Sequence, residues 1–63
     1  MTNAEKENWL INLENIAADV ASEYGADVVN GILSLYNAHS IEDLSPCYYS
    51  EIFSELYAIA SDN

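Results

Sequence analysis

The apolar residues near the start of the chain recur at intervals of three and four positions, and this spacing constrains the fold more than any other feature. The recurring residues are Trp9, Leu13, Ile16, Val20 and Tyr24. In an α-helix such positions lie on one side and form a stripe that can be buried. Thr2 and Glu5 have the spacing of a capping box, and Gly25 suits the left-handed conformation that ends a helix. The pattern predicts a helix over residues 3–24.

Two further helices are expected in the rest of the chain. Apolar side chains cover a wide arc of a helix over residues 26–37, which indicates the central and most buried helix of the fold. Gly31 lies within it, either where another helix approaches closely or at a kink. Ser45 followed by Pro46 is typical of a helix start and predicts a third helix over residues 46–60. Its buried stripe would consist of Tyr49, Ile52, Phe53, Leu56, Ile59 and Ala60.

The connector over residues 38–45 has room for a single turn that contains Ile41 and Leu44, with Ser40 and Asp43 as its caps. Three amphipathic helices with short connections predict an all-α fold, namely a compact three-helix bundle. The 63 residues allow one such acidic domain, residues 1–63.

The single cysteine, Cys47, cannot form a disulfide within the chain, and a lone thiol fits a reducing cytoplasm. No apolar run approaches the roughly 18 residues that span a bilayer. No basic segment followed by an apolar core suggests a secretory signal. We therefore expect a cytoplasmic protein without a membrane partner.

The charge of the chain restricts its partners. It has 11 acidic residues against one lysine and no arginine, for a net charge of −10. Neutralising nucleic-acid phosphates requires cations, so we expect no direct nucleic-acid binding. A helix-turn-helix reader is excluded as well, because its recognition helix would carry carboxylates instead of donors to bases. The expected partner is a basic protein surface.

Carboxylates gather on one side of the third predicted helix. Glu51, Glu55 and Asp62 lie within about 40° of one another around an ideal helix, opposite the buried stripe. Glu7 and Glu14 form a second acidic flank on the first helix. These side chains would attract a basic groove in a partner, as a phosphate backbone does. The alternative is a solvated surface that only confers solubility.

Two apolar side chains are candidates for a partner contact. Ile11 falls nearly opposite the buried stripe of the first helix, between Glu7 and Glu14. It is either an isolated exposed residue or an anchor for a partner or a second copy. Tyr48 is either the edge of the core or an exposed aromatic anchor of the kind found at binding hot spots.

The sequence has no catalytic pattern. Cys47 lies in the first turn of a predicted helix and His39, the only imidazole, precedes it by eight residues, but nothing in this spacing brings them together. Calcium-loop, H-E-x-x-H and glycine-rich phosphate-loop patterns are all missing from the sequence. We therefore expect no enzyme, no catalytic residues, no metal site and no cofactor.

The stretch from residue 24 to residue 57 resembles a small helical module of phage and mobile-element proteins. The resemblance rests on the runs SIEDLSP, residues 40–46, and YSEIFSEL, residues 49–56. In size, acidity and lack of enzymatic residues the whole chain also resembles the small phage-encoded anti-CRISPR proteins, several of which inhibit Cas9 by occupying basic channels for DNA or guide RNA.

This second resemblance implies an inhibitor that works in the cytoplasm of a bacterial host cell. It would mimic nucleic-acid charge and offer carboxylates to the arginines of a CRISPR nuclease. The residues expected to do so are Glu51, Glu55, Asp62, Glu7 and Glu14, with Ile11 or Tyr48 as an apolar anchor. The alternative is a non-enzymatic structural or accessory interaction module, for example a homodimer or a companion of a phage recombination protein.

Overall fold

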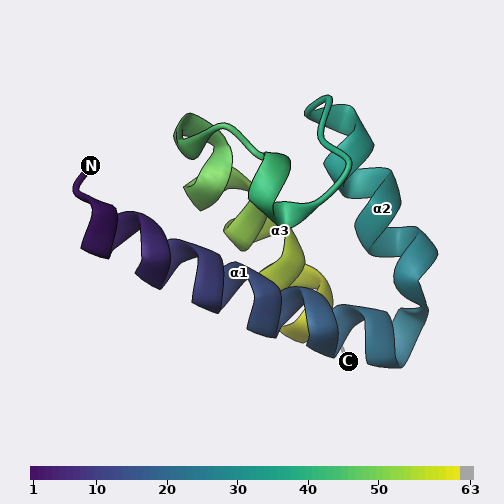
Figure 1. Ribbon diagram of the computed structural model, residues 1–63. Coiled ribbons are helices and arrows are strands. Elements are labelled where there is room, and N and C mark those ends of the chain that lie inside the picture. The colour runs from purple at the N-terminus through teal and green to yellow at the C-terminus, as the bar shows by residue number, and fades with distance from the viewer. Residues whose placement is uncertain (62–63) are drawn as a thin grey trace.

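The computed structural model describes residues 1–61, which form three α-helices and two short 3₁₀ helices. The elements are α1 (Asn3–Tyr24), α2 (Ala26–Leu35), η1 (Ile41–Asp43), η2 (Pro46–Tyr48) and α3 (Tyr49–Ser61). In Figure 1, α2 rises from the C-terminal end of α1, and α3 passes behind α1. The prediction of an all-α three-helix bundle is confirmed.

The start of α1 is held by the predicted capping box. The Glu5 amide donates to Thr2 Oγ1 at 3.2 Å, and the Thr2 amide donates to Glu5 Oε1 at 3.1 Å. The hydrogen bond that the Thr2 backbone amide donates to the Glu5 carboxylate, followed by an interaction with the Thr2 side chain, lowers the pKa of Glu5. With 22 residues at about 1.5 Å of rise each, α1 accounts for most of the 34 Å length of the molecule.

A single residue, Gly25, separates α1 from α2. Its amide donates to the Ala21 carbonyl at 2.9 Å, and its carbonyl accepts from the Val28 amide at 3.3 Å. The positive φ of 98° agrees with the expected helix end, but the ψ of 151° lies outside the left-handed helical region that we expected. This combination is open essentially to glycine alone, so Gly25 sets the angle at which α2 leaves α1.

The prediction that residues 26–37 form the most buried, central helix is wrong. α1 packs against both other helices, whereas α2 and α3 touch only narrowly. Only Val29 and Leu33 of α2 are buried, and Leu35 is 76% exposed. The reason is length, because the long α1 offers its apolar stripe to two partners and the ten-residue α2 covers only one part of it. A Cβ atom on Gly31 would meet nothing within 4 Å, so no close helix approach occurs there.

The core lies between α1 and the rest of the chain. It consists of Leu13, Ala17, Val20, Val29, Leu33, Ala38, Ile41, Leu44, Tyr49, Ile52 and Leu56. The inward positions of Ile41 and Leu44 confirm the turn expected in the connector. Phe53, Ile59 and Ala60 from the predicted stripe of the third helix are only partly buried. Tyr24 is 46% exposed rather than buried, because it ends α1 just where the chain turns away into α2.

The ends of α2 and α3 differ from the sequence prediction. α2 stops at Leu35, two residues early, because Asn37 adopts a φ of 58° and the Ala38 amide turns back to the Leu33 carbonyl at 3.1 Å. This is a Schellman ending with asparagine in the left-handed position. The third predicted helix starts as η2 at Pro46, becomes α-helical at Tyr49 and ends at Ser61.

Ser40 and Ser45 occupy the predicted N-cap positions, of η1 and η2 respectively, with extended backbone. The side chains of Ser40 and Ser45 make no capping hydrogen bond. The Asp43 carboxylate instead accepts from the His39 amide at 3.0 Å and closes the η1 turn from its other end.

Replacing each of the two glycines, Gly25 and Gly31, by alanine should change the stability of the protein in opposite directions. In both cases an added Cβ meets nothing within 4 Å, so the backbone conformation alone decides the effect. We expect Gly25→Ala to lower the free energy of unfolding by about 1–3 kcal/mol, because alanine resists this positive-φ, extended-ψ conformation. Gly31→Ala should raise it by up to about 1 kcal/mol through helix propensity. Urea unfolding of both variants measures the difference, and a stabilising Gly25→Ala would contradict the turn geometry.

Candidate functional site

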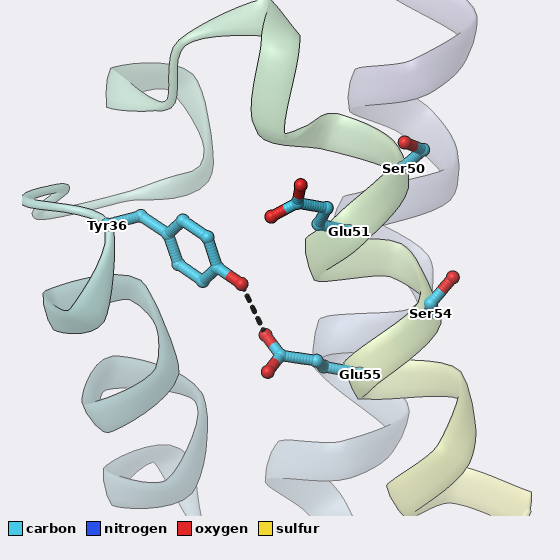
Figure 2. A pocket seen from close by; sticks show the side chains of 5 residues that line it. All are labelled: Tyr36, Ser50, Glu51, Ser54 and Glu55. Atoms are coloured by element: carbon cyan, nitrogen blue, oxygen red, sulfur yellow. Dashed lines mark hydrogen bonds between the residues drawn. The ribbon is translucent and has the colours of Figure 1, made fainter.

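The exposed side of α3 carries the acidic row expected from the sequence. Glu51 and Glu55 are both exposed. Figure 2 shows their side chains directed toward Tyr36, and those of Ser50 and Ser54 directed to the other side of α3. Asp62, the third member of the predicted row, lies outside the described residues.

Tyr36 joins the end of α2 to this row. Its hydroxyl donates to Glu55 Oε2 at 3.0 Å (Figure 2). Tyr36, Ser50, Glu51, Ser54 and Glu55 line a shallow open groove of about 410 Å³. The hydrogen bond to Glu55, followed by reduced hydration and the negative charges of Glu55 and Glu51, raises the pKa of the Tyr36 hydroxyl. The phenol therefore stays protonated at neutral pH and acts as a hydrogen-bond donor, and Glu55 keeps one carboxylate oxygen for another partner.

Tyr48 lies beside Tyr36, with ring centroids 5.0 Å apart and ring planes tilted by 55°. It is 37% exposed, so it belongs to the boundary between surface and interior. Tyr36 was not among the site residues predicted from the sequence. No local signal marks it, because Tyr36 precedes its partner Glu55 by 19 residues and lies in a segment whose apolar pattern suggested burial.

A row of aromatic rings lies on the α1 side of α3. The Trp9 ring packs edge-on against Phe53 at 6.0 Å, and Phe53 stacks with Tyr57 at 6.1 Å. Phe53, Ser54, Tyr57 and Ala58 line a second shallow groove of about 250 Å³. Tyr57 is 57% exposed. It was not predicted as a site residue, because predicting the exposure of one ring on a helix requires knowing which elements pack beside it.

Glu14 has a different neighbour from the one expected. The sequence pairs it with Glu7 on one flank of α1, but η1 packs against α1 and brings the Glu42 carboxyl to Glu14. The hydrogen bond with Glu42, together with the repulsion between the two charges, raises the pKa of Glu14. Glu7 is exposed on α1, and so is Ile11, at 56%. Neither of these two residues lines the two grooves on α3.

The two residues considered for nucleophilic chemistry lie in the connector region. Cys47 is an exposed free thiol in η2. His39 is exposed, and its backbone amide donates to Asp43. Within residues 1–61, no three side chains of His, Cys, Asp or Glu gather into a group that could hold a metal ion.

No protein-family model matches this chain, and no curated protein or solved structure matches it. Within residues 1–61, each helix is too short or too polar to cross a lipid bilayer.

The Glu14–Glu42 pair predicts a pH dependence of stability. The folded protein holds a proton on Glu14 at a pH where the unfolded chain has lost it, because the folded pKa is the higher one. The free energy of unfolding should therefore rise as pH falls from neutral through the raised pKa toward about 4.5. Glu42→Gln should flatten this rise, since it replaces the charged hydrogen-bond partner of Glu14 by a neutral amide and removes the repulsion.

The control is Glu7→Gln, which removes the same charge from an exposed position of α1. Thermal unfolding of both variants and the parent across this pH range makes the comparison. An equal pH dependence in Glu42→Gln and Glu7→Gln would assign the effect to net charge and not to the pair.

Proposed function

We propose that this protein is an anti-CRISPR inhibitor that occupies a basic nucleic-acid-binding site of a Cas9-type nuclease and blocks engagement of DNA or guide RNA. The observation that carries the proposal is the charge. One lysine stands against 11 carboxylates, so nearly all of the negative charge has no cation within the chain. A cationic partner is the simplest source of compensation. The resemblance in size and composition to phage-encoded inhibitors supports the choice of a CRISPR nuclease.

The exposed side of α3 supports the proposal chemically. Nucleases of this type hold nucleic acid in positively charged channels and read a short DNA motif with arginines. A guanidinium pairs with a carboxylate through two parallel hydrogen bonds. Glu51 is exposed and can pair in this way, whereas Glu55, with one oxygen bonded to Tyr36, can accept a single further hydrogen bond. Tyr48, which is 37% exposed beside Tyr36, offers aromatic surface to a guanidinium.

A second candidate is an interaction module that works as a homodimer. The observation in its favour is the 56% exposure of Ile11. The net charge of −10 weighs against it, because two copies repel one another. Sedimentation at several protein concentrations distinguishes the two, and Ile11→Asp should abolish a dimer that forms through this side chain.

The inhibitor proposal is tested with a DNA-cleavage assay on a purified Cas9-type nuclease. We expect inhibition to weaken as the salt concentration rises, because salt screens the charges. DNA should compete with the protein, since both would bind the same cationic side chains of the nuclease. Glu51→Gln combined with Glu55→Gln should weaken inhibition by about ten-fold or more, because two charge-assisted contacts are lost.

The matched control is Asp19→Asn combined with Glu23→Gln, which removes the same charge from exposed positions of α1. It should change inhibition much less. Equal losses in both double variants would mean that only net charge matters. Full inhibition by the α3 variant would remove this side of α3 from the binding surface, and a parent protein that leaves the nuclease fully active would end the proposal.

A further inference from the structure

We infer that the outward face of α3 is a docking surface for a cationic amphipathic helix of the partner. The inference rests on the proposed function only in that it takes the partner to be basic. The face has three parallel parts, which are an aromatic edge, a row of small side chains and an acidic edge.

The aromatic edge supplies an apolar contact. Tyr57 is 57% exposed, and its ring stacks on Phe53, which is itself supported by Trp9. The row is continuous with the core, because the Trp9 ring also lies 6.4 Å from that of the buried Tyr49. A large ring held in place by its neighbours loses little freedom on binding, which is why such residues dominate interface energetics.

The middle of the face is formed by small side chains. Ser50, Ser54 and Ala58 follow one another at intervals of four residues along α3, and all three are exposed. Ser54 borders both grooves, the aromatic one of about 250 Å³ and the acidic one of about 410 Å³. A row of small side chains parallel to a helix axis lets a second helix approach to the short end of the usual 8–10 Å. The shape therefore favours a helix lying along α3.

Charge complementarity identifies the occupant. Glu51 and Glu55 border the face on the side of Tyr36, and Phe53 and Tyr57 border it on the side of α1. A helix lying between them needs apolar side chains toward one border and lysine or arginine toward the other. A second copy of this chain fits poorly, because it has a single lysine and the same net charge of −10, so it cannot supply the cationic side chains that the acidic edge needs.

The test uses the intact protein and a synthetic helical peptide of leucine and lysine with its lysines on one face. Trp9, the only tryptophan in the chain, reports binding by fluorescence because it touches Phe53 at the edge of the face. We expect Tyr57→Ala and Ser54→Lys each to raise the Kd by about ten-fold or more. A scrambled peptide of equal composition and no amphipathic face should bind about ten-fold more weakly.

Two controls match these variants. Ser22→Lys makes the same charge change as Ser54→Lys on an exposed position of α1, and Leu35→Ala removes an exposed apolar side chain from α2 as Tyr57→Ala does from α3. Both should bind the peptide like the parent. Circular dichroism confirms folding, which all four exposed positions should preserve.

Three results would overturn the inference. They are equal Kd values for Ser54→Lys and Ser22→Lys, equal binding of the scrambled peptide, and a concentration-dependent dimer that Tyr57→Ala abolishes, since the last would make a second copy the occupant. No nuclease enters this assay, so its failure is separate from that of the proposed function. If the peptide docks as expected but the protein leaves the nuclease fully active, only the proposed function is refuted. If the protein inhibits the nuclease but Ser54→Lys and Ser22→Lys bind the peptide equally, only the docking face is refuted.

Discussion

The packing of the apolar stripe of α1 against α3 is the interaction on which the rest of the structure depends. Leu13 and Val20 of α1 and Ile52 and Leu56 of α3 are completely buried. A chain of this size removes only about 60% of its unfolded surface from water, so few apolar contacts hold the fold together. α2 adds a smaller contribution to the same stripe, and the one-residue turn at Gly25 sets its direction.

The same packing produces the candidate site. Burying one side of α3 leaves the opposite side outward, with an aromatic edge and an acidic edge separated by small side chains. The aromatic row continues from the buried Tyr49 through Trp9 and Phe53 to the exposed Tyr57, so the surface rings are supported from the core. A binding surface on a helix that is anchored in this way is preorganised, and less ordering accompanies association.

The high negative charge destabilises the fold. Like charges on one helix face destabilise it by a few tenths of a kcal/mol per pair, and the single lysine can relieve little of this repulsion. The close approach of Glu14 and Glu42, which raises the pKa of Glu14, is a local example of the same conflict. A cationic partner would relieve the repulsion on binding, which is the physical basis of the function proposed above.

The sequence by itself determined the helix over residues 3–24, the fold class and the outward position of Glu51 and Glu55, because all of these follow from the period of the α-helix. Only the tertiary structure decided that α1 is the central helix, that Tyr36 reaches Glu55, and that Glu42 lies against Glu14. Periodicity shows which side of a helix is apolar, but not which other element covers that side. Contacts between residues far apart in the chain depend on helix lengths and on the angles of the turns between them, and these follow from packing of the whole domain.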